Sequence, residues 1–284
     1  MAVALGLPVV LVFGFFSWWP IIRGLLMAWQ RTKTNEPTTW VGWDNFSYVF
    51  TLPELGHAAW NTVYFMLLAL VLGFPAPLFL AVVISSLRTR KWLYNVLSYL
   101  PVILPPVVAI LLWKEFYDPS PTGVFNTFLG WVGLGPYPWL NSPELAMPAL
   151  VLEATWASAG STVIIYLAAM ASVSKDLYEA ASLDGAGIWR KIWSVTLPQL
   201  RGVILVVLLL QLIGTAQVFA EPYVFTGGTG GAPNGSTQTI LLLIFHYAFE
   251  STDYGAASAI STLLAAALGI LSITYYWATR RWSS

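Results

Sequence analysis

The chain of 284 residues has no cysteine, only two histidines and no net charge. The absence of cysteine excludes disulfides, iron–sulfur clusters and thiol catalysis. His57 and His246 are far apart in the sequence, so we expect no metal site, and no catalytic constellation stands out. Without a basic face to neutralise phosphates, nucleic acid is not an expected partner.

Charged residues are also scarce, at 9% of the chain, whereas a soluble domain carries about 25%. Hydrophobic residues make up 57%. This composition excludes a solvated surface of ordinary size and predicts a protein whose main partner is the lipid bilayer. Many of the 15 tryptophans fall near the ends of apolar segments, as interface anchors do.

A membrane-spanning helix needs roughly 20 mostly apolar residues. The sequence predicts six spans, at about residues 3–27, 58–87, 93–112, 146–171, 202–225 and 256–277. Residues 240–249 are apolar but too short to span, so we expect a helix at the membrane interface or packed against the bundle. We see no internal repeat, and we expect residues 1–284 to form a single all-α transmembrane domain. The first segment lacks a basic leader, which favours a retained helix over a cleaved signal peptide.

The basic residues are divided unequally between the two sides of this topology. One side holds nine, namely Arg88, Arg90, Lys91, Lys175, Arg190, Lys191, Arg201, Arg280 and Arg281. The other side holds four, namely Arg23, Arg31, Lys33 and Lys114. Because cytoplasmic loops carry the excess of lysine and arginine, both termini are predicted to be cytoplasmic.

Residues 174–200, on the predicted cytoplasmic side, carry a distinctive pattern. Ser174 suits a helix N-terminus and is followed by acidic residues that favour the positive end of a helix. Gly185 can adopt the left-handed conformation that ends a helix. Apolar residues at helical spacing predict a second helix, which Pro198 is expected to close before the next span. The segment is therefore predicted to be a helix–turn–helix.

Within this segment stand Glu179-Ala180-Ala181, Asp184-Gly185-Ala186 and Leu197-Pro198. The spacing resembles the EAA loop of binding-protein-dependent importer permeases, in which E-A-A, G, I and L-P follow one another at fixed intervals. One position departs from that pattern, because Val195 stands where isoleucine is usual. The change removes one methylene and leaves the resemblance strong.

Weaker resemblances to carbohydrate-type permeases extend over nearly the whole chain. They lie in residues 41–46 with Asn61-Thr62, 100–107 with Trp113-Lys114, 219–228, and 249–259. The loop after residue 228 is a few residues longer than in that subgroup, so its contacts need not follow the subgroup.

The resemblance implies a type I permease subunit of an ATP-binding-cassette importer in the bacterial cytoplasmic (inner) membrane, working by alternating access. It implies no enzymatic activity and no cofactor on this chain, since ATP with Mg would act on a partner ATPase. The implied partners are a second homologous permease, a dimeric ATPase and an extracytoplasmic solute-binding protein. The implied solute is a carbohydrate or a glycerol-phosphate-like compound.

The resemblance also implies that the EAA loop is a coupling helix seated in a cleft of the ATPase. Glu179 would offer a carboxylate to that cleft, and Ala180 and Ala181 would permit close contact. Gly185 would make the turn that Asp184 braces. Leu197 and Pro198 complete the motif at the start of the next span.

Polar and aromatic residues in the predicted spans are candidates for the substrate path. A carboxylate at mid-bilayer costs about 2.5–3.5 kcal/mol, so Glu153 is expected to face the bundle interior, or else to lie at an interface or pair with the partner permease. Gln211 and Gln217 are six residues apart and do not share one helix face cleanly. Aromatic rings and amides suit sugars but more often only pack. The candidates are Asn61, Glu153, Trp156, Tyr166, Gln211, Gln217 and Glu221.

Two backbone features leave alternatives open. The glycine-rich run 226–236 lacks the lysine of a phosphate loop, so it is either a contact for the binding protein, through Gly227, Gly228 and Pro233, or a plain linker. Prolines at 101, 105 and 106 are expected to kink the third span, either as a bending point during gating or as a static kink.

Other classes of function are less well supported by the sequence. A secondary transporter usually shows mid-membrane charges for ion coupling and an inverted repeat, and neither is clear here. A membrane enzyme would need a cluster of acids or a metal site at one interface. An importer for an amino acid, a peptide or an inorganic ion stays open, because the EAA loop does not discriminate between solutes.

Overall fold

The computed structural model describes residues 2–34, 36–87, 89–228, 231 and 233–280. Arg88 and Arg281, which entered the charge count, lie outside the described residues, as do positions 229, 230 and 232 of the glycine-rich run. The described chain is helical apart from loops and one pair of two-residue antiparallel strands, β1 (Gln30–Arg31) and β2 (Thr39–Trp40).

The helical elements follow one another along the chain and include short π-helical or 3-10 segments, labelled η. They are α1 (Ala2–Phe13), η1 (Gly14–Trp18), α2 (Trp19–Met27), α3 (Asp44–Thr51), α4 (Pro53–Leu68), η2 (Ala69–Gly73), α5 (Pro75–Ser86), α6 (Lys91–Ile103), α7 (Pro106–Phe116), α8 (Val124–Gly130), η3 (Trp139–Asn141), α9 (Pro143–Ala171), α10 (Lys175–Leu183), α11 (Ile188–Lys191), η4 (Ile192–Thr196), α12 (Leu197–Thr215), α13 (Ala220–Phe225), α14 (Ile240–Phe245), η5 (His246–Glu250) and α15 (Tyr254–Arg280).

Five helices are long and apolar enough to cross a membrane, and a sixth span is formed by a bent pair. The five are Gly6–Met27, Pro53–Ser86, Pro143–Ala171, Ile188–Phe225 and Tyr254–Arg280. Each coincides with a predicted span. The predicted kink in the third span is confirmed and is sharp, because α6 and α7 meet at an angle of 98°. Leu104 between them is extended, as a residue before proline prefers to be, and Pro105 has no N–H to continue the helix.

Three other prolines follow π-helical turns. The segments η1, η2 and η4 each end two residues before a proline. The prolines are Pro20, Pro75 and Pro198, respectively. In each, the backbone N–H of the residue before the proline donates to a carbonyl five residues back, as from Leu197 to Ile192. The wider turn makes room for a ring that would clash in an α-helix. The prediction that Pro198 closes a helix was therefore wrong, since the helix that begins at Ile188 continues through it.

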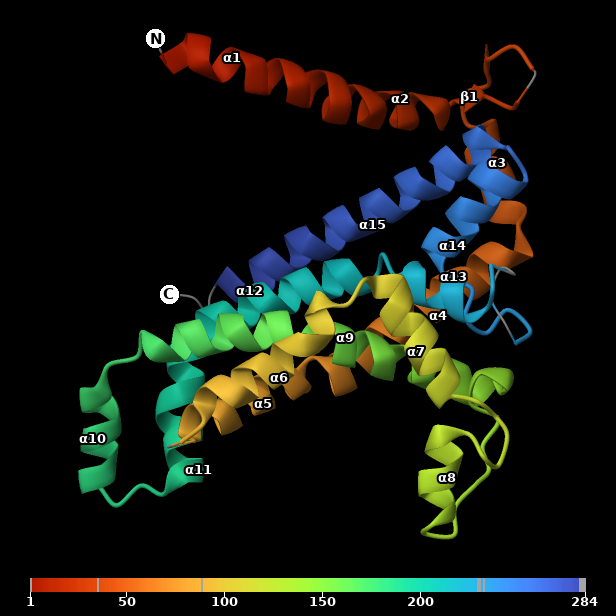
Figure 1. Cartoon of the computed structure of the whole chain (residues 1–284). Helices are drawn as coiled ribbons and strands as arrows, with labels where there is room; N and C mark the ends of the chain where they lie inside the picture. Colours follow the sequence, from red (N-terminus) through yellow and green to blue (C-terminus); the bar gives the residue numbers. More distant parts are fainter. Residues whose placement is uncertain (1, 35, 88, 229–230, 232, 281–284) are drawn as a thin grey trace.

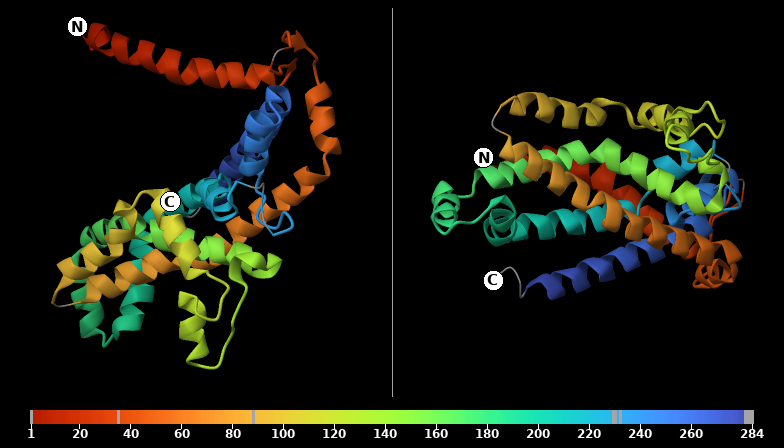
Figure 2. Two further views of the ribbon diagram at one scale, coloured as in Figure 1. Left: turned by 45° about the vertical axis from the view of Figure 1, so that its right-hand side comes forward. Right: turned by 90° about the horizontal axis from the view of Figure 1, so that it is seen from below.

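The helix α9 is the centre of the bundle. It packs against α5 and α6 at one end, and against α4, α7 and α12 (Figures 1 and 2). Two of the three apolar clusters are built on it, one around Leu150 and Tyr117 and the other around Val163 and Tyr166. The third lies between α3, α4, α14 and α15. There Leu243 of α14 is buried, so this short helix packs against the bundle, as one of the two predicted alternatives had it.

The N-terminal helix stands apart from this bundle. In the span Gly6–Met27, the most apolar stretch is 0% buried, and Figure 1 shows α1 diverging from α15. The helix is attached at one end, where α2 and β1 meet α15.

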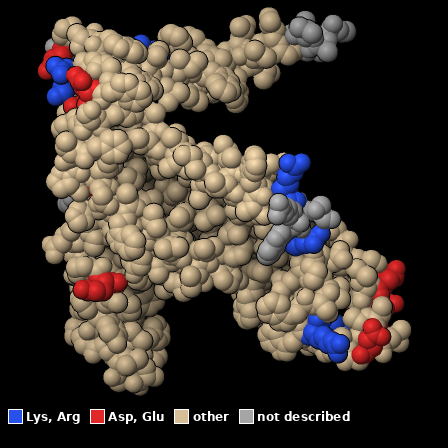
Figure 3. Space-filling view, turned by 180° about the vertical axis from the view of Figure 1, so that it is seen from behind, with Lys and Arg blue, Asp and Glu red and all other residues tan. Residues whose placement is uncertain are grey.

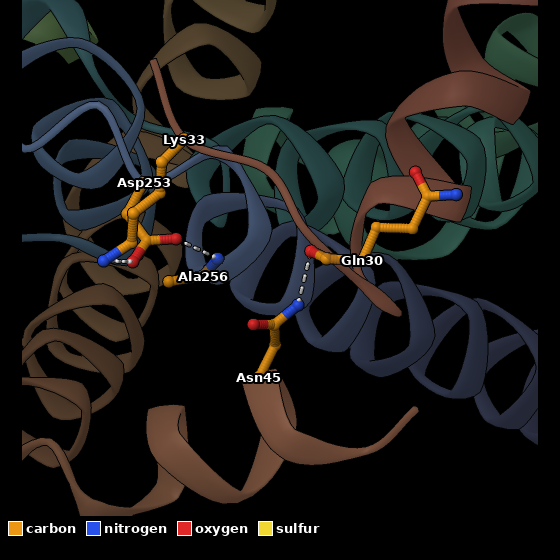
Figure 4. A network of polar contacts seen from close by, with 5 residues as sticks. All are labelled: Gln30, Lys33, Asn45, Asp253 and Ala256. Atoms are coloured by element: carbon orange, nitrogen blue, oxygen red, sulfur yellow. Dashed lines mark hydrogen bonds and ion pairs between the residues drawn. The ribbon is translucent and has the colours of Figure 1, made fainter. Parts of the chain in front are cut away.

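That attachment is held by a small set of polar contacts, which we call the N-terminal clamp (Figure 4). Asn45 Nδ2 donates to the backbone oxygens of Ala28 and Gln30, both at 2.9 Å. Lys33 Nζ lies 3.4 Å from Asp253 Oδ2, and the other oxygen of Asp253 accepts from the N–H of Ala256 at 3.0 Å. The clamp therefore joins the loop after the first span to the start of the last one.

The clamp leaves no room for a side chain at Gly255, where a Cβ would meet Gln30 O at 2.6 Å and Asn45 Nδ2 at 2.9 Å. We predict that Gly255→Ala lowers the free energy of unfolding by about 1–3 kcal/mol, the usual cost of overpacking. Thermal unfolding of the purified protein in detergent measures it. The control is Gly269→Ala in the same helix, where a Cβ meets nothing within 4 Å. Equal melting temperatures for the two variants would contradict the clamp.

Candidate translocation path and coupling loop

A cavity of about 610 Å³ lies between the second, fourth and fifth spans. Its size falls within the usual range of ligand pockets, about 300–1,000 Å³. Most of its lining is apolar or small, with a few polar groups from two of the spans. These are Thr155, Ser158 and Thr162 of α9, together with Gln211, Thr215, Gln217 and Glu221. The cavity is therefore a membrane-embedded space with hydrogen-bonding groups.

Three of the predicted path residues, Gln211, Gln217 and Glu221, line this cavity. The glutamines share it despite their spacing because α12 ends at Thr215 and Gln217 lies in the turn before α13. The sequence offered no signal for that break. The hydroxyls of α9 were also missed, because serine and threonine are common in spans for packing alone.

Gln211 connects two spans at the cavity wall. Its Nε2 donates to the backbone oxygen of Ala69 at 2.8 Å, in the π-helical turn η2. A Cβ on Gly73 would meet Thr155 Oγ1 at 2.9 Å and Gln211 Nε2 at 3.3 Å. The second, fourth and fifth spans thus meet closely at Gly73, and the glutamine ties two of them together.

The structure does not bring Glu153, Trp156 or Asn61 to the cavity wall. Glu153 is 1% exposed, inside the bundle, and its Oε2 has no hydrogen-bond partner. Trp156 packs beside Trp113, with ring centroids 5.6 Å apart. Tyr166 is buried in an apolar cluster. Glu153 therefore lies in the bundle interior, as expected, and Trp156 and Tyr166 pack, as one of the predicted alternatives had it. A role of these residues on the path stays a prediction.

Asn61 holds the glycine-rich loop instead. Its Nδ2 donates to the backbone oxygens of Gly235 at 2.8 Å and Gln238 at 2.9 Å. The neighbouring Thr62 Oγ1 accepts from the N–H of Ile240 at 2.9 Å. The loop is thus tied to the second span.

The predicted contact residues of this loop occupy a turn. Gly227 and Gly228 have φ values of +65° and +80°, a conformation that favours glycine. Gly227 is exposed, whereas Gly228 and Pro233 are half-buried. Their role in contacting another protein stays a prediction.

At the other end of the bundle, α10 and α11 form the predicted helix–turn–helix, which projects beyond the spans (Figure 1). Ser174 Oγ accepts from the N–H of Asp176 at 3.2 Å and caps α10. Asp184 is the C-terminal cap, and Gly185 follows with φ of +74°. The N–H of Ala186 closes the turn by donating to Ala181 O at 2.9 Å.

Two side-chain contacts fix α10 relative to the helix that follows. Lys191 Nζ donates to Ser182 Oγ at 2.7 Å, and the hydroxyls of Tyr178 and Thr196 lie 3.0 Å apart. The motif residues Glu179, Ala180, Asp184, Gly185 and Pro198 are exposed, and Ala181 and Leu197 are half-buried. The EAA motif thus lies on a rigid, accessible surface.

The loop also exposes apolar side chains that the sequence did not single out. Leu183 is 90% exposed, and Ile188, Trp189 and Trp193 are also exposed. Beside them, a groove of about 810 Å³ runs between α5, α6, the end of α9 and η4. An apolar surface of this kind marks a site of protein or membrane contact.

Exposed charges are scarce over the middle of one face of the molecule. Figure 3 shows a broad uncharged band on one face, with lysine, arginine, aspartate and glutamate gathered toward its ends. With six apolar spans, a cavity among them and a projecting loop at one end, the chain has the architecture of an integral membrane transport protein.

Comparison with known families agrees with this class. Residues 73–283 match the family described as binding-protein-dependent transport system inner membrane component. The chain belongs to this family, and it is a multi-pass protein of the inner membrane. The family is one of transport permeases and not of enzymes.

Two curated relatives and one solved structure show the likeness in detail. The chain is 31% identical to the arabinooligosaccharides transport system permease protein AraP of Halalkalibacterium halodurans, covering 96% of this chain and 85% of the relative. It is 31% identical to the trehalose/maltose transport system permease protein MalF of Thermococcus litoralis, covering 90% and 86%. A bacterial alginate ABC transporter in complex with alginate pentasaccharide-bound periplasmic protein gives a TM-score of 0.86 at 29% identity, covering 99% of this chain and 94% of the other.

The hydrogen bond between the second and fifth spans gives a direct test of the cavity wall. We predict that Gln211→Met lowers the free energy of unfolding by about 0.5–1.5 kcal/mol, because the oxygen of Ala69 loses a donor. Gln217→Met is the matched control, since Gln217 is exposed and bonds within its own turn to Ile213. Thermal unfolding compares them, and an equal effect of both substitutions would contradict the proposed tie.

Proposed function

We propose that this chain forms part of the path for a carbohydrate in an ATP-driven importer. The observation that carries the proposal is the cavity between the second, fourth and fifth spans, lined by hydroxyl, amide and carboxyl groups. Such groups pair with sugar hydroxyls, and the names of the relatives mention arabinooligosaccharides and trehalose or maltose. Within the cavity, Gln211, Gln217 and Glu221 are the proposed contacts.

The exposed loop at one end supports coupling to an ATPase dimer. Glu179 and Ala180 are exposed on α10. Small side chains allow a partner backbone to come close, and Gly185 sets the turn. The helix from Ile188 is continuous with α12, whose far part lines the cavity. A displacement of the loop would therefore reach the cavity wall, with ATP and Mg acting on the ATPase alone.

The N-terminal helix, which is attached to the bundle at one end only among the described residues, is consistent with a second permease as partner. Its apolar side chains, among them Leu11, Phe16 and Ile21, are exposed along its length. Among the described residues, the main contacts of this helix with the rest of the chain are those of α2 with α15 and β1. Lipid and a neighbouring permease are the surfaces that would cover it, and the membrane-embedded cavity would then lie between two homologous subunits.

The basic residues support a cytoplasmic position for residues 174–200, which we call the coupling loop, and for both termini. Among the described residues, Lys175, Arg190 and Lys191 lie in that loop, with Arg90 before α6 and Lys91 at its first position. The opposite end would face a solute-binding protein, with Gly227, Gly228 and Pro233 as candidate contacts. One structural neighbour is a complex with a periplasmic protein.

The coupling role predicts a charge-sensitive contact at Glu179. We expect Glu179→Lys to abolish co-purification of an ATPase from the native host, because the side chain is exposed on the motif surface. Glu36→Lys is the matched control, since it makes the same change on an exposed residue outside the loop. Retention of the ATPase by Glu179→Lys would refute the coupling contact. If the unmodified chain brings down no ATPase, the importer proposal fails.

The path role predicts a loss of uptake on changing Glu221. A hydrogen bond to a charged group contributes about 1.5–3 kcal/mol, so we expect Glu221→Gln to lower apparent sugar affinity about tenfold or more. The measurement is uptake of a labelled oligosaccharide by cells, with co-purified ATPase recorded in parallel. Glu36→Gln is the control. Unchanged affinity in Glu221→Gln with normal assembly would place the sugar elsewhere.

A further inference from the structure

Residues 119–142 form a hairpin that leaves the bundle after α7 and returns into α9. We call it the α8 hairpin, after the short helix at its centre. Figure 1 shows α8 running across the direction of α9 and off the side of the bundle, at the end opposite α10. The left view of Figure 2 shows the same sideways projection. The segment lies between the predicted third and fourth spans.

The α8 hairpin contains no lysine, arginine, aspartate, glutamate or histidine. Its tip exposes large apolar side chains, with Phe128 54%, Trp131 74% and Val132 72% exposed. Other loops at this end are different, because Lys33 and Asp253 there form an ion pair. A neutral tip that exposes contiguous apolar residues marks a contact surface rather than a water-facing loop.

The base of the hairpin satisfies its polar groups internally. Asn126 is 2% exposed, and its Nδ2 donates to the backbone oxygens of Asp118, Ser120 and Tyr137 at 3.1–3.3 Å. Its Oδ1 accepts from the N–H of Tyr137 and from Trp139 Nε1, both at 2.9 Å. One side chain therefore binds both arms of the hairpin.

Backbone hydrogen bonds also pair N–H groups at the end of α8. The N–H groups of Val132 and Leu134 both donate to Leu129 O, at 3.1 and 2.9 Å. The N–H of Gly133 donates to Gly130 O at 3.1 Å. Unpaired backbone groups cost several kcal/mol in a lipid environment, so internal pairing is the condition for a segment to enter it.

We propose that the α8 hairpin lies in the lipid interface, on the leaflet opposite the coupling loop, and anchors the protein there. Three observations favour lipid: the lack of charge, the internal hydrogen bonds at the base of the hairpin and at the end of α8, and aromatic side chains, which settle at the interface of the bilayer. The hairpin follows the bent third span, so the anchor would hold α7 at its angle to α6. The proposal needs only that the chain is a membrane protein, and not the proposed substrate or ATPase contact.

The absence of cysteine allows a direct test with a single introduced thiol. Phe128→Cys and Trp131→Cys replace exposed side chains, so folding is not expected to change. Each is labelled with an environment-sensitive nitrobenzoxadiazole dye, and the protein is placed in phosphatidylcholine nanodiscs with the subunits that accompany it. Glu36→Cys, an exposed and charged position outside the coupling loop, is the control. Quenching is measured with iodide in water and with lipids spin-labelled near the headgroup.

At the hairpin positions we expect strong quenching by the spin-labelled lipid and several-fold weaker quenching by iodide than at position 36. Raised salt should leave both unchanged, because the hairpin carries no charge. Iodide quenching equal to that of the control would show a water-facing loop and overturn the proposal. Protection from both quenchers would show that another protein covers the tip, and would overturn it as well.

Discussion

The rest of the structure depends on one constraint, which is that a helix inside a bilayer must satisfy its own backbone hydrogen bonds despite its prolines. At Pro20, Pro75 and Pro198 a π-helical turn absorbs the ring and the helix continues. At Pro105 no such turn forms among the described residues, and the third span bends by 98°. The π-helical turns and the sharp bend at Pro105 thus give different kinds of span.

The irregular helix turns determine where the polar groups of the proposed path lie. The π turn η2 presents the oxygen of Ala69 to Gln211, which ties the second span to the fifth at 2.8 Å. The π turn η4 lets one helix run from the coupling loop into the cavity wall. A third irregularity, the break after Thr215, turns Gln217 into the cavity. The proposed path therefore lies where regular helix geometry is interrupted, because there polar groups become available in an apolar setting.

Composition was enough to predict the class of fold and the positions of the spans, since long apolar runs have few alternatives. The coupling loop was predicted with its cap at Ser174 and its turn at Gly185, because both are local backbone signals. The kink at Pro105 was predicted, whereas the continuation of the helix through Pro198 was not, since the two prolines differ in their surroundings and not in their chemistry. Asn61 was expected to meet the solute but holds a loop, and only the tertiary structure supplies its partners.

In the proposed mechanism, the helix from Ile188 to Thr215 moves as one body and carries motion of the coupling loop to the cavity. Distance measurement between spin labels tests it most directly, with labels on Trp193→Cys and Leu210→Cys, both exposed on that helix, in the complex with its ATPase. If the helix moves as one body, the distance between these two labels stays unchanged when ATP is added. The distance from Leu210→Cys to Val83→Cys on α5 changes. A changed distance between positions 193 and 210 would show that η4 is a hinge, and would contradict motion of the helix as one body.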